Sequence, residues 1–356
     1  MNKKVLSLFL VGLLAVFAFA LFGCGGDETT TDETETDVTV ETTTEDTATE
    51  STEASGGEAA ESDYPSRTIE VINQFGPGGG TDLFIRAIGM PMAKITDQSI
   101  VGISVTGGGG VPAATEFFNR PADGYTMMAI GPEEVINHAM GRIDATQFLP
   151  VARIQYDQGL FFVGPDSEYE SVEQLIEFAR ENPGELSIGI TGAAGFDEVL
   201  VGLWNLRSEA ELEVVPFESS AEAQAAVLGG HTDLMYEEYG PMRALIESGE
   251  VTPLVLFSEE RLPVLEDVPT ALELGIDVTL GRWRGFAFKE GTDQQYVDTM
   301  FGVIEEAVDD PLYTSVEEQN MLQYRSELLG PDEFQKFFDN ELETYSDVLE
   351  QLDLAQ

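Results

Sequence analysis

A glycine turn near the start of the folded part contains residue types that can hold an anion. The turn contains four glycines: Gly76, Gly78, Gly79 and Gly80. Because glycine has no side chain, an anion could reach their backbone N–H groups without obstruction. A short apolar segment precedes the turn, and Thr81 and Asp82, both of residue types that begin helices, follow it. This order places N–H donors at the positive end of a helix dipole, where an anion is stabilised. The sequence therefore predicts an anion site, with a close-packed turn lacking any ligand as the alternative.

The motifs of common catalytic and nucleotide sites are absent from the sequence. The two histidines, His138 and His231, lie far apart and form no HExxH pattern, and neither a GxSxG nor a P-loop sequence occurs. Asp82, Asp197 and Asp233 are acid–base candidates, but cap and first-turn positions explain Asp82 and Asp197 equally well. We expect no catalytic residue, no cofactor and no metal site, so the protein is not predicted to be an enzyme.

The first residues have the pattern of an export signal. A short basic start precedes an apolar run that ends at Gly23, and Cys24 follows in what resembles a bacterial lipoprotein cleavage site. We expect residues 1–23 to be a lipoprotein signal peptide and Cys24 to carry the lipid; an uncleaved, membrane-spanning run is the alternative. Both place the folded part outside the cytoplasm, in the periplasm or at the cell surface. Cys24 is the only cysteine, so no disulfide forms within the chain.

Residues 24–63 are expected to form a disordered tether. From Asp27 onward the segment contains no Lys or Arg, is rich in Thr, Asp and Glu, and lacks aromatic residues. Such a composition buries too little apolar surface to offset the entropy lost on ordering.

The charge of the chain excludes a class of partner. With 66 acidic and 17 basic residues the formal net charge is −49, so a nucleic-acid backbone would be repelled. Because 42% of the residues are apolar, this acidity does not indicate disorder and resembles adaptation to high salt. We therefore expect a halophilic source.

Beyond Tyr64 the sequence alternates strand and helix patterns, which indicates an α/β fold with mainly parallel sheets. Further strands end in loops that contain glycine, at 106–110, 131–134 and 191–195. Two lobes facing each other across a cleft are therefore expected: domain 1 from residues 64–163 plus 285–356, and domain 2 from residues 164–284. Residues 332–352 have an amphipathic helix pattern that we assign to packing.

Several motifs, in order, resemble the solute-binding proteins of tripartite tricarboxylate transporters, the Bug family. They are Phe75-Gly-Pro-Gly-Gly-Gly-Thr-Asp-Leu-Phe-Ile-Arg86, Pro121-Ala-Asp-Gly-Tyr-Thr126, Asn182-Pro-Gly-Glu-Leu186, Val215-Pro-Phe217, Leu228-Gly-Gly-His-Thr-Asp233, Asp267-Val-Pro-Thr270 and Trp283-Arg-Gly-Phe286. The match runs from about Tyr64 to the C-terminus.

The resemblance implies a two-lobed periplasmic binding protein fold, type II-like, that closes on a small organic carboxylate. It also implies that the receptor is a monomer and delivers the ligand to a membrane permease of one large and one small subunit. A lipoprotein that presents its closed form to a signalling partner is the alternative, and an extracytoplasmic enzyme is a third. Carried over by motif, the ligand contacts are Phe75, Gly79, Gly80, Thr81, Asp82, Gly131, Pro132 and Glu133 in domain 1, and Thr191, Ala194, Gly195, Phe196 and Asp197 in domain 2.

The departures from the family pattern concern the ligand. Hydroxyl-bearing positions are replaced in the loop Gly131-Pro132-Glu133-Glu134, and Glu218-Ser219 stands where Lys-Gly is usual. With fewer hydroxyls and more carboxylates, we expect a tri-anion such as citrate to fit worse than a monocarboxylate, a zwitterion or a more apolar acid. The alternative is that Glu133 and Glu134 face solvent in the first turn of a helix.

Overall fold

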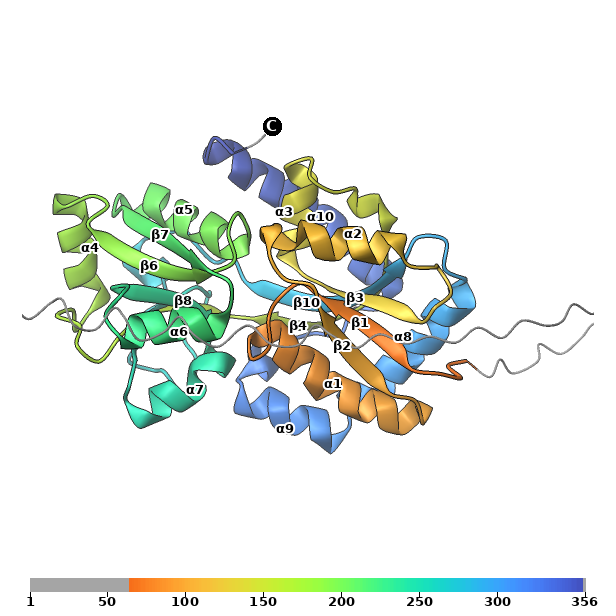
Figure 1. The fold of residues 1–356 in the computed structure, drawn as a ribbon. Coiled ribbons are helices and arrows are strands. Elements are labelled where there is room, and N and C mark those ends of the chain that lie inside the picture. The colour runs from red at the N-terminus through yellow and green to blue at the C-terminus, as the bar shows by residue number, and fades with distance from the viewer. Residues whose placement is uncertain (1–63, 355–356) are drawn as a thin grey trace, which may run out of the picture. The chain divides into compact units, whose positions relative to one another are not determined.

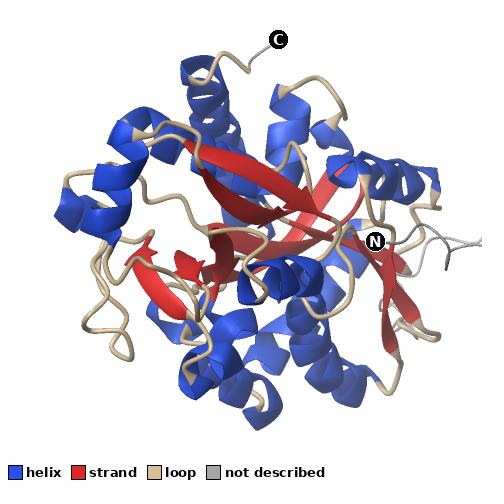
Figure 2. Ribbon diagram, turned by 60° about the vertical axis from the view of Figure 1, so that its left-hand side comes forward, coloured by secondary structure: helices blue, strands red, loops and turns tan. Residues whose placement is uncertain are grey.

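The structure is a computed structural model that describes residues 64–354, which lie within one compact unit. The predicted signal peptide, the lipid site at Cys24 and the tether of residues 24–63 lie outside the described residues. Two five-stranded sheets with helices on both faces give the predicted α/β architecture (Figure 1, Figure 2). We call each sheet with its helices a lobe.

The first lobe contains a sheet of order β2-β1-β3-β10-β4. Its strands are β1 (Ile69–Asn73), β2 (Ile100–Ser104), β3 (Thr126–Ile130), β4 (Phe148–Asp157) and β10 (Arg282–Lys289). The helices of this lobe are α1 (Gly80–Thr96), α2 (Val111–Asn119), α3 (Pro132–Ala139), α8 (Gln294–Val308), α9 (Pro311–Gln319) and α10 (Pro331–Gln351). β1, β2 and β3 are parallel, and β10 is antiparallel to its neighbours β3 and β4.

The second lobe contains a sheet of order β7-β6-β8-β5-β9. Its strands are β5 (Gly159–Val163), β6 (Leu186–Thr191), β7 (Leu212–Phe217), β8 (Leu234–Glu238) and β9 (Thr252–Leu256). Its helices are α4 (Val172–Glu181), α5 (Phe196–Ser208), α6 (Ser220–Leu228) and α7 (Tyr239–Ser248). Short 3₁₀ turns occur in the two lobes at Gly108–Gly110, Ala145–Gln147, Leu272–Leu274 and Leu322–Tyr324.

The chain changes sheets twice, and both places differ from the predicted domain boundaries. β5 belongs to the second sheet, although residues 159–163 were assigned to domain 1. β10 begins the return to the first sheet at Arg282, although residues up to 284 were assigned to domain 2. A single residue, Gln158, separates β4 from β5, and apolar residues lie on both sides of it, so the sequence pattern does not show that the two strands belong to different sheets.

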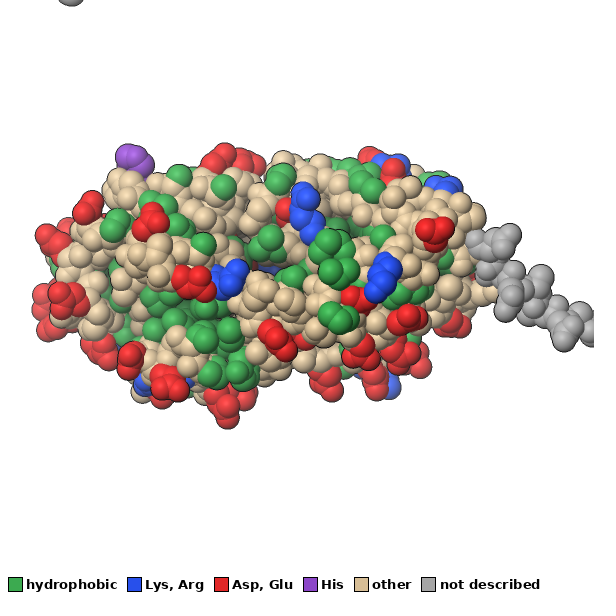
Figure 3. Space-filling view, turned by 90° about the horizontal axis from the view of Figure 1, so that it is seen from below, with side chains coloured by type: hydrophobic (Ala, Val, Ile, Leu, Met, Phe, Trp, Pro, Cys, Tyr) green, Lys and Arg blue, Asp and Glu red, His purple; other side chains and the backbone are tan. Residues whose placement is uncertain are grey.

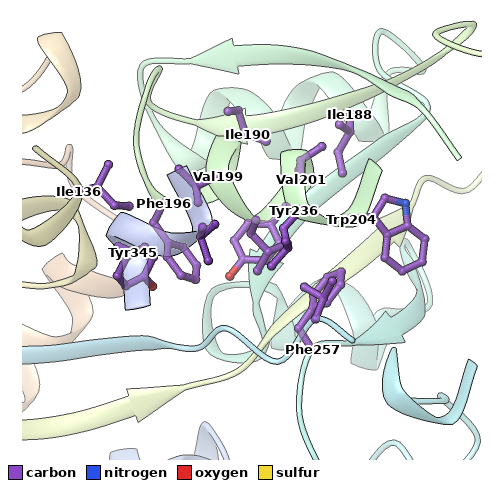
Figure 4. Packing of buried hydrophobic residues seen from close by; sticks show 14 of the residues in the cluster. Ile136, Ile188, Ile190, Phe196, Val199, Val201, Trp204, Tyr236, Phe257 and Tyr345 are labelled. Atoms are coloured by element: carbon purple, nitrogen blue, oxygen red, sulfur yellow. The ribbon is translucent and has the colours of Figure 1, made fainter. Parts of the chain in front are cut away.

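Alternate residues of the strands pack into different apolar clusters. On β5, Phe161 and Val163 belong to the cluster that contains Trp204 and Phe257, both labelled in Figure 4. Leu160 and Phe162 instead pack with residues of the helices α6 and α7. Since both faces of the sheet are covered, a continuous apolar sequence is what a strand here requires.

The C-terminal helix α10 packs as predicted. Phe334 and Phe338 are buried on the face that meets the first lobe, and Trp283 of β10 lies edge-on to both. The helix contacts α3 and β4 and also reaches α5 of the second lobe.

Acidic side chains are distributed over the surface, as Figure 3 shows for one face, with few Lys or Arg between them. Among residues 64–354, none of the helices combines the length and apolar character needed to cross a membrane.

Candidate functional site

The predicted glycine turn joins β1 to α1, but the predicted cap residues do not cap the helix. α1 begins at Gly80, its N-cap is Gly79, and no side chain bonds the N-terminal turn as a cap. Asp82 instead accepts hydrogen bonds from Gly78 N at 3.0 Å and from Arg86 Nε at 2.9 Å. A glycine has no side chain with which to cap, so the first backbone N–H groups of α1 are left for another acceptor.

Two arginines on β10 extend into the space between the lobes. Arg282 and Arg284 occupy alternate positions, so their side chains lie on the same face of the strand. Both are buried, with 6% and 4% of their side chains exposed. A buried guanidinium requires paired carboxylates, and each arginine has several.

Arg282 joins the two lobes. It donates at 2.5 Å to Glu133 at the start of α3 in the first lobe and also to Asp197 at the start of α5 in the second. Its Nε lies 2.7 Å from Glu238 Oε1 at the end of β8, although that approach does not have hydrogen-bond geometry. The guanidinium also lies over the ring of Phe196, 4.7 Å from the centroid.

Arg284 forms the second bridge. It donates to Glu238 Oε1 at 3.0 Å, lies 3.5 Å from Asp157 Oδ2, and donates to Thr81 Oγ1 at 3.2 Å. Thr81 belongs to the first turn of α1, so this arginine lies directly against the glycine turn. Glu238 is thus shared by both arginines.

Burial and charge shift the acidity of these carboxyl groups in opposite directions. Burial raises the pKa of Asp157 to about 7, and the neighbouring charge of Glu238 adds to the rise. The pKa of Asp197 is likewise raised to about 7 by burial, although Arg282 opposes the shift. Burial alone would raise the pKa of Glu238, but Arg284 and Arg282 hold it at about 2. Glu237 has its pKa raised well above the usual range by burial and by Glu238. Since opposite charges favour the ionised form, Glu238 remains the charged partner of both arginines.

The alternative that Glu133 and Glu134 face solvent is wrong. Both are buried, with 3% and 1% exposed, and Glu133 pairs with Arg282. Glu134 turns back to the start of α3, where its carboxylate accepts from Gly131 N at 2.7 Å and from Gln74 Nε2 at 2.8 Å. Burial and the charge of Glu133 raise the pKa of Glu134 to about 8. The sequence places Glu133 and Glu134 in the first turn of a helix, but it does not show that the second lobe and β10 cover that turn.

A small cavity of about 20 Å³ lies among these groups, which is room for about one water molecule. Its first-lobe wall comes from the glycine turn, and its second-lobe wall comes from the ends of β6 and β8 and the start of α6. The residues around it are Phe75, Gly76, Gly79, Gly80, Thr81, Thr191, Asp197, Ser220, Glu237, Glu238, Arg282 and Arg284. Thr191 Oγ1 is buried and has no hydrogen-bond partner among the described residues.

The structure brings most of the predicted ligand contacts together. Six of them surround this cavity: Phe75, Gly79, Gly80, Thr81, Thr191 and Asp197. Gly131 and Glu133 line a smaller adjoining cavity, of about 10 Å³, on the other side of the arginines.

The remaining predicted contacts lie outside both cavities. Asp82 binds Gly78 N, Pro132 is buried in α3, and Gly195 is the N-cap of α5. Ala194 accepts a hydrogen bond through its carbonyl oxygen from Arg142 of the first lobe, at 3.1 Å. Phe196 packs beneath Arg282.

Sequence reasoning missed Arg282, Arg284, Glu238, Asp157 and Ser220. The signal for the arginines was available: an Arg-Trp-Arg alternation at the start of a buried strand, in a chain with only 17 basic residues. Two arginines on the buried face of a strand call for acidic partners.

No group of three or more His, Cys, Asp or Glu side chains within residues 64–354 is arranged to hold a metal ion.

Known proteins resemble the chain in sequence. The profile described as the tripartite tricarboxylate transporter family receptor matches residues 84–354. BugT of Bordetella pertussis is 24% identical over 294 residues, covering 80% of this chain and 89% of BugT. A protein encoded in the tcbD–tcbE intergenic region of Pseudomonas sp. strain P51 is 28% identical over 256 residues, covering 70% of this chain and 76% of that protein.

Solved structures share the fold. Rpa4515 of R. palustris with adipate has a TM-score of 0.76 at 24% identity, covering 82% of this chain and 99% of that one. MatC from Rhodopseudomonas palustris with bound malate has a TM-score of 0.73 at 24% identity, covering 80% of this chain and 100% of that one.

The matching profile spans most of the chain, and the fold with its facing loops agrees with it. The chain belongs to the receptor family of the tripartite tricarboxylate transporters, the Bug family of periplasmic solute-binding proteins.

Proposed function

We propose that this protein is an extracytoplasmic receptor that captures a small organic carboxylate between its two lobes and delivers it to a membrane permease of one large and one small subunit. The observation that carries the proposal is the uncapped start of α1 against Arg284, at the wall of an interlobe cavity. Backbone N–H groups at a helix start and a guanidinium are the two groups that proteins use most readily to hold a carboxylate. Relatives of the same fold carry adipate and malate.

Binding begins with a ligand carboxylate on the free N–H groups of Gly80 and Thr81 while the lobes are apart. Closure then brings Asp197 and Glu238 of the second lobe onto the two arginines of β10. Because the lobes meet through these ion pairs, the ligand and the closed state stabilise each other. The closed form is the one that a permease distinguishes from the empty, open receptor.

The proposed ligand contacts are of three kinds. The glycine turn supplies backbone donors, Arg284 and Arg282 supply charge, and Thr191 and Ser220 supply hydroxyl groups. The monocarboxylate, zwitterion or apolar acid expected from the sequence fits this set better than citrate does, because both arginines are already shared with buried carboxylates.

A thermal-shift screen of the purified protein against a panel of small carboxylates, with citrate included, tests the proposal. A ligand present at about a hundred times its Kd stabilises the folded state by about 2.7 kcal/mol, which raises the melting temperature measurably. At least one small carboxylate should raise it, and citrate should raise it least. If no carboxylate changes the melting temperature, the receptor function is wrong.

We also propose that a lipid on Cys24 anchors the receptor to the cell membrane, with residues 24–63 as a tether. The support is the sequence pattern around that single cysteine. The C24S variant should appear in the soluble extracytoplasmic fraction, while the natural protein stays with the membrane. Equal membrane association of both would contradict the lipid anchor.

A further inference from the structure

The interlobe site contains more carboxyl groups than cations. Two guanidinium groups, those of Arg282 and Arg284, face five carboxyl groups, namely Glu133, Asp157, Asp197, Glu237 and Glu238. Both guanidinium groups already have carboxylate partners, so neither is free for an incoming anion.

A ligand that is only an anion therefore competes with the protein's own carboxylates. If its carboxylate takes Arg282, the buried Asp197 loses its cation, and if it takes Arg284, the buried Asp157 loses its own. In either case Glu238, which both arginines share, keeps only one of its two cations. An unpaired charge inside a protein is strongly unfavourable, and removing one member of a buried pair destabilises more than the pair itself contributes. A plain carboxylate thus carries a penalty at this site that its own contacts must offset.

We propose that the cleft selects a ligand that bears a cationic nitrogen next to its carboxylate, in the manner of a small amino acid, over the plain carboxylate with the same carbon skeleton. The inference rests on the proposed carboxylate-receptor function and names the ligand class. A zwitterionic ligand can replace both halves of an ion pair that it breaks. Its carboxylate pairs with the arginine and with the glycine turn, and its ammonium group pairs with the protein carboxylate that the arginine has released.

The two walls of the cavity suit the two ends of such a ligand. The first-lobe wall supplies donors, from Gly79 to Thr81 and Arg284, whereas the second-lobe wall supplies acceptors. An ammonium group has three hydrogens to donate, and the acceptors on the second-lobe wall include Asp197, Glu238 and the unpartnered Thr191 Oγ1. Thr191 Oγ1 is buried without a hydrogen-bond partner in the described part of the chain, so a ligand donor would satisfy it.

Titration calorimetry with matched pairs of ligands tests the inference. The pairs are propionate with alanine, and succinate with aspartate, each measured on the natural protein at neutral pH. Glycine betaine, whose nitrogen is cationic but has no hydrogen to donate, separates the effect of charge from that of hydrogen bonding. The better amino acid should bind at least about ten-fold more tightly than its plain partner, a difference of about 1.4 kcal/mol.

The outcomes separate the ligand class from the function. If propionate or succinate binds as tightly as its amino acid or more tightly, the ligand class is wrong and the receptor function stands. If no compound of these pairs binds and no carboxylate shifts the melting temperature, both are wrong.

A variant localises the selection. In D197N one acceptor charge of the second-lobe wall is lost, so the preference for the amino acid should fall to about three-fold or less, and D197E should restore it. The control is D277N, since Asp277 is exposed in the same lobe and outside the cavity. Melting temperatures of all the variants, measured without ligand, show that each is folded. A preference unchanged in folded D197N would overturn the inference.

Discussion

Arg282 of the first lobe donates a buried hydrogen bond to Asp197 of the second lobe. The two residues are 85 positions apart in the chain and belong to different sheets, so the contact exists only while the lobes are together. The same guanidinium reaches Glu133, which places one cation between the starts of two helices. Arg282, which links the two lobes, is therefore also one of the residues around the interlobe cavity.

Replacing Arg282 tests this connection. In R282Q the carboxylates of Glu133 and Asp197 lose their buried cation, so the free energy of unfolding should fall by about 3–5 kcal/mol in chemical denaturation at neutral pH.

The matched control for that change is R86Q. Arg86 pairs with Asp82 on the surface, where 68% of its side chain is exposed, and its loss should cost less than about 1 kcal/mol. Equal effects of R282Q and R86Q would show that the interlobe ion pairs do not hold the lobes together.

The second prediction concerns the close approach at Gly80. A Cβ atom there would overlap Arg284 Nη2 and lie 2.9 Å from Glu238 Oε2, so G80A must displace the arginine from the glycine turn. We expect carboxylate affinity in titration calorimetry to fall by at least about a hundred-fold, the loss of one charge-assisted contact of about 3 kcal/mol.

The G302A variant serves as the control for G80A. Gly302 lies within α8, and a Cβ atom there would meet no heavy atom within 4 Å. Alanine should therefore leave binding unchanged and add up to about 1 kcal/mol of stability. Undiminished binding by G80A would place the carboxylate away from the start of α1.

The third prediction is a stability that declines as pH rises. Burial raises the pKa of Glu134 to about 8 and those of Asp157 and Asp197 to about 7, above their unfolded values near 4. The folded state therefore binds more protons than the unfolded state between about pH 4 and pH 8. The stabilisation is fully present below about pH 4 and is lost as pH rises through the folded values. Urea denaturation at a fixed, high NaCl concentration across this range measures the decline.

Glu134 can be isolated from the other carboxyl groups with E134Q. A glutamine there still accepts from Gly131 N and can donate to Gln74 Oε1, which has no partner among the described residues. The slope of stability against pH should become less steep by up to about 1.4 kcal/mol per pH unit, the equivalent of one proton. E259Q changes an exposed carboxylate and should leave the slope as it is. An unchanged slope in E134Q would mean that Glu134 is already ionised at neutral pH.

The fourth prediction follows from the net charge of −49. Self-repulsion destabilises the compact state in dilute buffer, and salt screens it over about 10 Å at 0.1 M and about 3 Å at 1 M. The free energy of unfolding should therefore rise as NaCl is increased from about 0.1 M to the molar range. Unfolding on addition of NaCl would contradict the proposed halophilic source.

The sequence was informative where a local pattern determines local structure. The glycine turn between β1 and α1 and the amphipathic helix α10 both follow from residues close together in the chain. The ordered motifs gave the family and hence the two lobes.

The ion-pair network could not be predicted in the same way, because it is assembled from distant segments. Glu133 looks like an ordinary first-turn carboxylate until Arg282, 149 positions later, is placed beside it. Thr81 and Asp82 are residue types that cap helices, but α1 begins at Gly80, whose backbone lies tightly against Arg284. In both cases a tertiary contact outweighs a local preference.

The proposed receptor function requires that a ligand carboxylate binds at the start of α1 between the two lobes. A crystal structure of the protein with the small carboxylate or amino acid that binds most tightly tests it most directly. We expect a ligand carboxylate oxygen within about 3.2 Å of the backbone N–H of Gly80 or Thr81, with the side chains of Arg284 and Glu238 beside it. A ligand bound elsewhere, or one whose carboxylate points away from the glycine turn, would show that the start of α1 is not the carboxylate site.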